Sequence, residues 1–273
     1  MKKFFAILLT GVLTLGLAAC GGSEPAADES GITLKIGATP TPHAEILTAA
    51  KDELAAQGIT LEIVEFTDYV QPNLATDSGD LDANFFQHTP YLDTFNADHG
   101  TELVSAGTVH YEPMGIFGGT AKALADIPEG GKIGIPNDGT NGGRALLLLE
   151  ANGLIKLNPE AGISATKLDI IENPLNLEII DMDAAQLPLS LGDLSAAVIN
   201  GNFAMQNGLN VADALAIEAA DSLAAETYGN IVAVKAGNEE LPGIAELMQV
   251  LQGEAIAEFI ANTYGGAVVS TAK

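Results

Sequence analysis

Short apolar runs alternate along the chain with longer segments whose apolar residues recur at helical spacing. The runs predict strands at 33–38, 60–66, 81–86, 102–109, 114–117, 132–135, 168–171, 177–181, 196–199 and 229–234. The helical spacing predicts helices at 42–57, near 68, from 90, at 121–127, through 144, at 244–251 and at 254–264. This order predicts an α/β fold with mostly parallel sheets covered by helices on both faces.

A second series of strands and helices begins after residues 111–113, which divides the chain into two α/β sets. About 240 residues follow the N-terminal segment, enough for one large or two medium domains. In open sheets of this kind, ligands bind at the carboxyl ends of the strands and often between domains. We therefore expect a ligand cleft between the two sets.

The first 20 residues have the pattern of a targeting signal. Two lysines precede an apolar run at 4–17, which is shorter than the roughly 20 residues that span a bilayer. The run ends in Leu-Ala-Ala-Cys at 17–20, which resembles the lipobox of bacterial lipoproteins. We predict a signal peptide over 1–19 and lipidation of Cys20. The small, polar and acidic residues that follow predict a flexible tether, so that 20–31 links the lipid to the folded chain.

Composition narrows the classes of function. Cys20 is the only cysteine, so the folded part has no disulfide, cysteine-based metal cluster or catalytic thiol. Without Lys2 and Lys3, 9 basic residues remain against 36 acidic ones, a net charge of −27. Such a surface repels nucleic acid and anionic lipid headgroups. We expect no nucleic-acid partner, and membrane association through the lipid alone.

Arg144 is the only arginine among the 11 basic residues. It lies in the stretch PNDGTNGGRALLLLE (136–150), after an apolar strand and a glycine-rich turn and in the first turn of a helix. Free backbone N–H groups at such a position favour an anion. A guanidinium can also hold a carboxylate through two parallel hydrogen bonds. Two interpretations stay open: Arg144 binds the carboxylate of a ligand, or it pairs with an acidic side chain of the protein.

Two clusters at predicted strand ends combine aromatic and polar side chains. The first is FTDYVQPN (66–73), which contains Tyr69. The second is NFFQHTPY (84–91), with three aromatic residues and His88 in a chain that is 5% aromatic. Because side chains alternate along a strand, one of Phe85 and Phe86 should face the core and the other the cleft. Packing by both rings, and a structural role for His88, are the alternatives.

A third cluster offers asparagines. Asn200, Gly201 and Asn202 follow a predicted strand, and Asn230 opens another. An asparagine side chain both accepts and donates hydrogen bonds, which suits a ligand ammonium. Turn formation is the alternative for an Asn-Gly pair, and we favour it for Asn202.

Enzyme signatures are mostly absent from the sequence. It has none of the usual serine-hydrolase, zinc-protease or phosphate-loop motifs. The four histidines, at 43, 88, 99 and 110, lack a metal-ligand spacing along the chain. We therefore expect no enzyme activity, no cofactor and no metal. An arginine for a carboxylate, asparagines for an amine and aromatic rings for an apolar group together describe an amino acid with a hydrophobic side chain.

Several longer strings resemble the methionine-binding lipoproteins of the NlpA family. They are TPHAEIL (41–47), FTDYVQPN (66–73), DANFFQHTPYLD (82–93), VHYEPM (109–114), PNDGTNGGRALLLLE (136–150), ENPLNLEI (172–179) and AVIN (197–200). The resemblance extends over almost the whole chain. It implies a two-lobed periplasmic-binding-protein fold, type II-like, with the ligand cleft between the lobes, and delivery of a small amino acid to a methionine-importing ABC transporter.

The resemblance also implies roles for single residues. Tyr69, Phe86 and His88 would surround the thioether chain from the first lobe. Arg144 would clamp the α-carboxylate from the second lobe, with Asn141 supporting its loop. We expect no protein anion to pair with Arg144 in the absence of ligand, so its replacement by alanine should abolish binding and leave the fold intact.

Asn200 and Asn230 would bind the amino and carboxylate groups near the hinge. Gly139 departs from the family pattern, since many relatives have proline there, and a looser loop could alter affinity. Sulfur–aromatic contacts contribute only about 0.3–1.5 kcal/mol each. The arginine and the asparagines therefore select an amino acid, and the shape of the aromatic pocket selects which one.

These observations predict a lipid-anchored, monomeric receptor in the cell envelope whose lobes close over L-methionine. Its partners would be the permease of an ABC importer and, through it, the ATPase. The predicted lobes are 32–112 with 228–273, and 113–227, and the crossing strands lie near 111–118 and 227–234. The alternatives are another ligand (D-methionine, a methionyl dipeptide or another small apolar amino acid), a secreted hydrolase, and a lipoprotein that binds only another protein.

Overall fold

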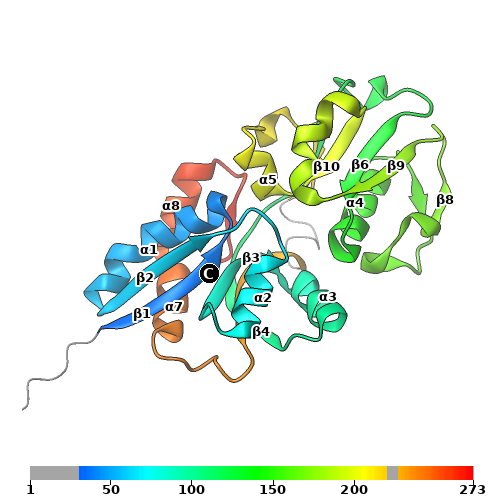
Figure 1. Cartoon of the computed structure of the whole chain (residues 1–273). Coiled ribbons are helices and arrows are strands. Elements are labelled where there is room, and N and C mark those ends of the chain that lie inside the picture. The colour runs from blue at the N-terminus through cyan, green and yellow to red at the C-terminus, as the bar shows by residue number, and fades with distance from the viewer. Residues whose placement is uncertain (1–30, 220–226, 273) are drawn as a thin grey trace, which may run out of the picture. The chain divides into compact units, whose positions relative to one another are not determined.

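The structure is a computed structural model and describes residues 31–219 and 227–272. The predicted signal peptide, Cys20 and nearly all of the predicted tether lie outside the described residues. The described chain forms two larger sheets and a small third one, and helices pack against the larger sheets (Figure 1). Within the described ranges, no helix is both long and apolar enough to cross a membrane.

The first sheet has the strand order β13-β4-β12-β3-β1-β2. Its strands are β1 (Ile32–Ala38), β2 (Ile59–Glu65), β3 (Ala83–His88), β4 (Leu103–Tyr111), β12 (Gly229–Lys235) and β13 (Val269–Ser270). Its helices are α1 (Glu45–Ala56), α2 (Gln71–Ser78), α3 (Thr89–His99), α7 (Ile244–Leu251) and α8 (Glu254–Tyr264). A short π-helical turn, Pro40–Ala44, precedes α1.

The second sheet has the strand order β11-β5-β10-β6-β9. Its strands are β5 (Gly115–Gly118), β6 (Lys132–Pro136), β9 (Glu178–Met182), β10 (Ala196–Ile199) and β11 (Ala216–Ile217). Its helices are α4 (Gly139–Ala151) and α5 (Gly201–Gln206), and β7 (Lys156–Leu157) pairs with β8 (Ile170–Glu172) in the small third sheet. Short 3-10 turns lie at Leu124–Asp126, Gly162–Ser164, Lys167–Asp169, Ala184–Gln186, Pro188–Asp193 and Val211–Asp213.

Burial explains why the central elements form where they do. Every residue of β3 is buried, and β12 is buried from Gly229 to Val234. From Ile231 to Val234, β12 is a continuous apolar run, as expected for a central strand, whereas β3 also buries polar side chains. Helix α7 buries Ile244, Leu247 and Leu251, which share one helical face. The first sheet and its helices enclose one core, and the second sheet has its own.

The sheets are mixed, so the prediction of mostly parallel sheets is wrong. Strand β1 pairs in parallel with β2 and β3, whereas β12 runs antiparallel to both β3 and β4. In the second sheet, β6 is parallel to β9 and β10, and β5 is antiparallel to β10. Strand β12 follows a strand of the second sheet, so no local strand-helix-strand unit with β3 or β4 sets its direction in the first sheet.

The boundaries of three elements also differ from the prediction. The segment 121–127 forms only the 3-10 turn Leu124–Asp126, because Pro128 disfavours a helical conformation at the residue before it. The segment 168–171 begins as the 3-10 turn Lys167–Asp169, closed by a capping box, before β8 starts. Helix α2 begins at Gln71 and not near 68, since the Asp68 side chain accepts the backbone N–H groups of Val70 and Gln71.

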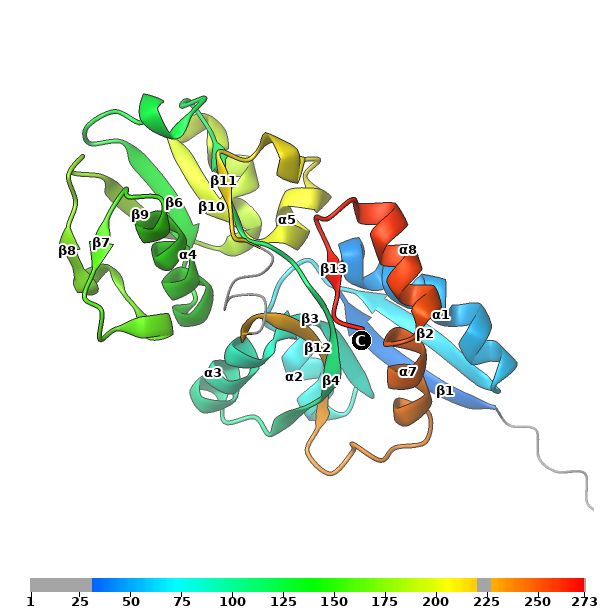
Figure 2. The ribbon, with the colours of Figure 1, turned by 180° about the vertical axis from the view of Figure 1, so that it is seen from behind.

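The chain passes between the two larger sheets at two places. The first is the short link between β4 and β5, which is seen from behind in Figure 2. The second lies between β11 and β12, and part of it, 220–226, is outside the described residues. The lobe boundaries at 112/113 and 227/228 stay a prediction.

Candidate functional site

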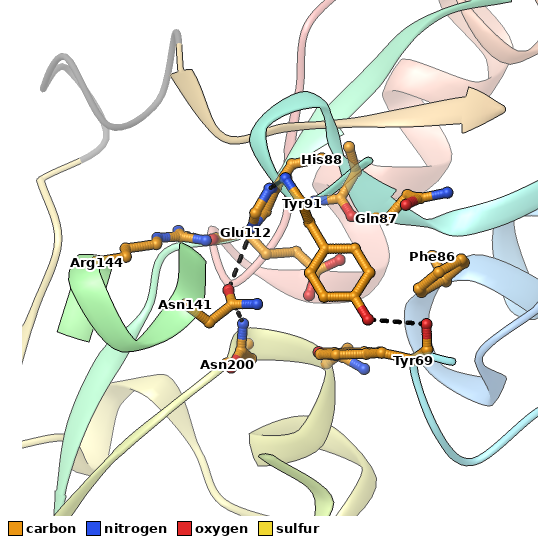
Figure 3. Close-up of a pocket in the computed structure, with 12 residues that line it drawn as sticks. Tyr69, Phe86, Gln87, His88, Tyr91, Glu112, Asn141, Arg144 and Asn200 are labelled. Carbon is orange, nitrogen blue, oxygen red and sulfur yellow. Dashed lines mark hydrogen bonds between the residues drawn. The ribbon is translucent and has the colours of Figure 1, made fainter. Parts of the chain in front are cut away.

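One cavity gathers all seven residues predicted to bind the ligand. The predicted residues are Tyr69, Phe86, His88, Asn141, Arg144, Asn200 and Asn230. The sequence interpretation did not include Gln87, Tyr91, Glu112, Gly201 and Asn202, which also line it (Figure 3). The space between these side chains is about 330 Å³ when the adjoining open solvent is included.

Aromatic rings form one wall of the cavity. The Phe86 ring lies 5.7 Å from Tyr69 and 6.1 Å from Tyr91, and the Tyr91 hydroxyl donates to the Tyr69 carbonyl at 3.0 Å (Figure 3). Phe85 points to the opposite face of β3 and packs in the core. The predicted alternation of Phe85 and Phe86 is therefore confirmed. Tyr91 belongs to the aromatic cluster at 84–91 described above. Its place in that cluster could have identified it as a residue that lines the cavity.

His88 ends β3 and caps α3. Its Nδ1 accepts the backbone N–H of Tyr91 at 3.2 Å, so its proton is on Nε2, which faces Asn141 Oδ1 at 3.2 Å. Burial, together with the charge of Arg144, lowers the pKa of His88 to about 3. His88 is thus a neutral hydrogen-bond donor at neutral pH.

Asn141 joins the helix that carries Arg144 to two other parts of the cavity. Asp138 caps α4 by accepting the Asn141 backbone N–H at 2.7 Å, and it also accepts the Asn141 side-chain Nδ2. This leaves Asn141 Oδ1 to accept from His88 and from Asn200 Nδ2, the latter at 2.8 Å. The supporting role predicted for Asn141 matches this geometry, in which both ends of its amide are already occupied.

Two asparagines of the second sheet carry polar atoms that lack partners. Asn200 Oδ1 and Asn202 Nδ2 are buried without a hydrogen bond to any of the described residues. Asn202 Oδ1 accepts the Tyr69 hydroxyl at 2.6 Å. The interpretation of Asn202 as a turn residue is wrong, because it lies inside α5 and its side chain reaches Tyr69. A buried acceptor and a buried donor without partners suit the charged ends of an amino acid.

Arg144 has a protein partner, contrary to the expectation. Its Nε and Nη2 donate to the two carboxylate oxygens of Glu218 at 2.8 and 2.5 Å, and Nη2 also donates to the Glu112 carbonyl at 2.9 Å. Burial alone would lower the pKa of Arg144, but the ion pair with Glu218 raises it above its ordinary value. The cause of the error is that Glu218 lies far along the chain, beside a crossing segment that the sequence pattern does not place. The interpretation of Arg144 as the partner of an acidic side chain is therefore confirmed. Arg144 also lines the cavity, and its binding of a ligand carboxylate stays a prediction.

Behind the cavity, Glu112 forms a buried cluster with two histidines. Its Oε1 lies 2.8 Å from His110 Nε2 and 3.3 Å from His43 Nε2. His43 Nε2 also contacts Asn230 Oδ1 at 3.1 Å, and the strand register places Asn230 opposite both His88 and His110.

Burial sets the protonation states in this cluster. It lowers the pKa of His43 to about 4 and that of His110 to about 3, and it raises the pKa of Glu112. Each of the three side chains offers one atom that could ligate a metal ion, and these atoms lie within 4.8 Å of one another. The spacing of the residues along the chain did not indicate this grouping. The hydrogen bond between His110 and Glu112, and those that hold the His43 ring to Thr39 and Asn230, account for this grouping.

Comparison with known proteins identifies the family. The profile of the NlpA lipoproteins matches residues 34–272. The chain belongs to the NlpA lipoprotein family. Nearly all of the described residues, and every residue that lines the cavity, fall inside that match.

Solved and curated members of the family resemble this chain over most of its length. A crystal structure of a lipoprotein from Ruminococcus gnavus is 52% identical, with a TM-score of 0.86, and covers 87% of this chain and 98% of that one. A nutrient-binding protein from Burkholderia cenocepacia, solved bound to methionine, is 42% identical with a TM-score of 0.82, covering 87% and 99%. The D-methionine-binding lipoprotein MetQ of Salmonella typhimurium is 37% identical over 270 residues, 98% of this chain and 97% of that protein. The two-lobed binding-protein fold predicted from the sequence is confirmed by these structures.

Proposed function

We propose that this protein is a lipid-anchored substrate-binding protein that captures L-methionine and delivers it to an ABC importer. The observation that carries the proposal is the pairing of an aromatic wall with buried polar atoms that lack partners. Asn200 Oδ1 is an acceptor and Asn202 Nδ2 is a donor, and Arg144 and Glu112 place a positive and a negative charge beside them. Such a set is complementary to a zwitterion with an apolar side chain.

The proposed ligand would lie with its polar end toward the second sheet. Its α-carboxylate would take the free donor of Asn202 and a hydrogen of Arg144. Its ammonium would face Glu112 and the free acceptor of Asn200. Its thioether would pack against Tyr69, Phe86 and Tyr91, where sulfur–aromatic contacts are favourable. The methionine bound to the Burkholderia cenocepacia relative supports this choice of ligand.

Hydrogen bonds between the two sheets support a closed form as the one that carries the ligand. Thr140 Oγ1 lies 3.1 Å from Thr94 Oγ1, and Gln206 Nε2 donates to the Thr41 carbonyl at 3.1 Å. We propose that the lobes are 32–112 with 228–273, and 113–227, and that they close by a hinge motion at the two crossings. The closed form would dock on the permease, which works with its ATPase. The protein would be a monomer held by lipid on Cys20 at the outer face of the cytoplasmic membrane or in the periplasm.

The proposal is tested by binding to the mature domain. Protein starting at Gly21 is unfolded and refolded to remove any carried ligand, and its thermal unfolding is followed with L-methionine, L-alanine or L-glutamate. A ligand at about 1,000 times its Kd adds about 4 kcal/mol to the free energy of unfolding. We expect a large rise in melting temperature with methionine and little with the other two. No rise in refolded protein would contradict the proposal.

The stereochemistry of the ligand is tested by comparing the two enantiomers of methionine. The Salmonella typhimurium relative is described as D-methionine-binding, so D-methionine is the strongest competitor. Titration calorimetry of both enantiomers, with methionylglycine as a longer ligand, ranks the three. We expect L-methionine to bind most tightly. Tighter binding of D-methionine would identify that enantiomer as the ligand and leave the class of protein unchanged.

A further inference from the structure

Glu218 is a buried carboxylate outside the wall of the cavity. It follows β11, on the segment by which the chain leaves the second sheet, and is 8% exposed. Its Oε2 accepts the Tyr111 hydroxyl and the Met114 backbone N–H, both at 2.8 Å. Tyr111 is the last residue of β4, and Met114 lies in the link between β4 and β5. The carboxylate thus ties one crossing segment to the other.

These two hydrogen bonds hold Glu218 independently of Arg144. A buried carboxylate without donors is costly, and here the donors come from a backbone N–H and a buried tyrosine. Glu218 is therefore a fixed point beside the hinge, and not a mobile surface side chain that happens to meet an arginine.

The guanidinium of Arg144 is oriented by this fixed point. Glu218 occupies Nε and one hydrogen of Nη2, and the Glu112 carbonyl takes the other. The Tyr228 ring lies 4.3 Å from the Arg144 Cζ atom and covers one face of the guanidinium. Nε and Nη2 are thus taken up by protein acceptors, whereas Nη1 makes no hydrogen bond within 3.5 Å to any of the described residues.

We propose that Glu218 is a positioning residue that presents Nη1 of Arg144 to the α-carboxylate of the ligand. The inference rests on the amino-acid-binding function proposed above. In this arrangement Arg144 binds the ligand carboxylate through one nitrogen and not through two. The other carboxylate oxygen of the ligand accepts from Asn202 Nδ2. The arrangement also makes ligand recognition depend on the geometry of both crossings, because Glu218 links them.

The test compares two ligands that differ only at the carboxylate. L-Methionine and L-methioninamide are titrated into the wild type and into Glu218→Gln. The glutamine keeps the size of the side chain but cannot accept from all four donors. We expect the affinity for methionine to fall by roughly tenfold or more, the scale of one charge-assisted hydrogen bond, and the affinity for methioninamide to change much less.

Two further variants make the result specific. Glu172→Gln makes the same chemical change at an exposed glutamate that pairs with Lys156, and it should leave both affinities unchanged. Tyr111→Phe removes one hydroxyl donor to Glu218 and keeps the ring near Arg144, so it should give a smaller loss of the same kind. It also provides a readout if Glu218→Gln does not fold.

Each outcome decides between the two proposals. Equal losses for both ligands would mean that Glu218 is only structural and would overturn the positioning role. Tighter methionine binding by Glu218→Gln would make Glu218 an internal competitor for Arg144 and would also overturn it. A wild type that binds no amino acid would reject the proposed function, and the positioning role with it. A wild type that binds methionine, with variants that behave like it, would reject the positioning role alone.

Discussion

The hydroxyl of Tyr69 donates to Asn202 Oδ1 at 2.6 Å and joins the loop before α2 to the first turn of α5. Tyr69 belongs to the first sheet's part of the chain, and Asn202 follows a strand of the second sheet. The same tyrosine ring packs against Phe86 and, at 4.8 Å, against Phe203. One side chain therefore forms the apolar wall of the cavity and also bridges the two sheets.

Replacing Tyr69 by phenylalanine should separate these two roles. The ring and its contacts remain, but the hydrogen bond between the lobes is lost and Asn202 loses its partner. Because one such bond contributes about 0.5–1.5 kcal/mol, we expect methionine affinity to fall about three- to tenfold. Stopped-flow measurements should place most of the change in the dissociation rate.

A matched control removes a tyrosine hydroxyl from a helix that packs against the first sheet. Tyr264 donates to Glu45 Oε2 at 2.6 Å, away from the cavity. Tyr264→Phe should therefore bind methionine as the wild type does. If both variants lose affinity equally, the bond between Tyr69 and Asn202 has no special part in closure.

Arg144→Ala should abolish binding and also destabilise the fold. The variant leaves Glu218 buried without a countercharge, and breaking a buried ion pair in this way costs about 3–5 kcal/mol. Urea unfolding measures the loss of stability, and calorimetry measures binding. A variant with both Arg144→Met and Glu218→Gln removes both charges and keeps an acceptor for Tyr111 and Met114, so it should recover part of the stability but none of the binding. An unchanged urea midpoint for Arg144→Ala would contradict the structural role of the ion pair.

The buried histidines predict a specific dependence of stability on pH. The pKa of His110 is about 3 in the folded state, and the ordinary value is 6.5. Between these values the unfolded chain binds a proton that the folded chain does not, so this contribution to stability is present above pH 6.5 and is lost as the pH falls.

This contribution can be isolated with His110→Gln, whose amide still donates to Glu112. Between about pH 6 and pH 4, the wild type should lose stability relative to the variant by about 1.4 kcal/mol per pH unit. The opposing proton uptake of Glu112, whose raised pKa acts in the reverse direction, is present in both proteins. His99→Gln changes an exposed histidine, and the pH dependence of its free energy of unfolding should be parallel to that of the wild type. Parallel curves for His110→Gln as well would refute the assignment.

Glu112→Gln should reveal how the ligand ammonium is recognised. Glu112 lines the cavity and is 5% exposed, so a charge placed beside it is poorly screened. We expect methionine binding to weaken by roughly tenfold or more, as for loss of a charge-assisted hydrogen bond. The 2-hydroxy analogue of methionine, which has no ammonium, should lose much less. Glu258→Gln, on the exposed face of α8, is the control. Equal losses for both ligands would argue against contact between Glu112 and the ammonium.

Much of the fold could be predicted because periodicity is local. The continuous apolar run of β12 and the helical spacing of α7 depend on residues within one element, and both were predicted close to their observed bounds. The short segments were predicted less well. At 121–127 the apolar spacing indicated a helix, but the proline that follows leaves only a single turn.

The candidate site could be predicted where its residues stand out along the chain. A lone arginine near the start of a helix and a dense aromatic cluster at the end of a strand are visible without a structure. The prediction that Arg144 lies in the first turn is wrong, because Asp138 caps the helix, α4 begins at Gly139, and the residue lies in the second turn. Asn202 could not be distinguished from a turn residue, because its contact with Tyr69 joins two separate parts of the chain. Glu112 and His43 were missed for the same reason, since each is an ordinary residue among many until the strands are paired.

The sequence by itself determined the order of the main elements and the placement of Phe85 and Phe86 on opposite faces of β3. It placed Arg144 in the first turn of its helix, whereas α4 already begins at Gly139 and Arg144 lies in the second turn. The correct expectations follow from side-chain periods of 2 and 3.6 residues and from the chemistry of helix ends. Only the tertiary structure decided that β12 runs antiparallel and that Arg144 meets Glu218 beside the two crossing segments. Such contacts depend on where the chain crosses between two sheets, and no local pattern of polar and apolar residues encodes that path.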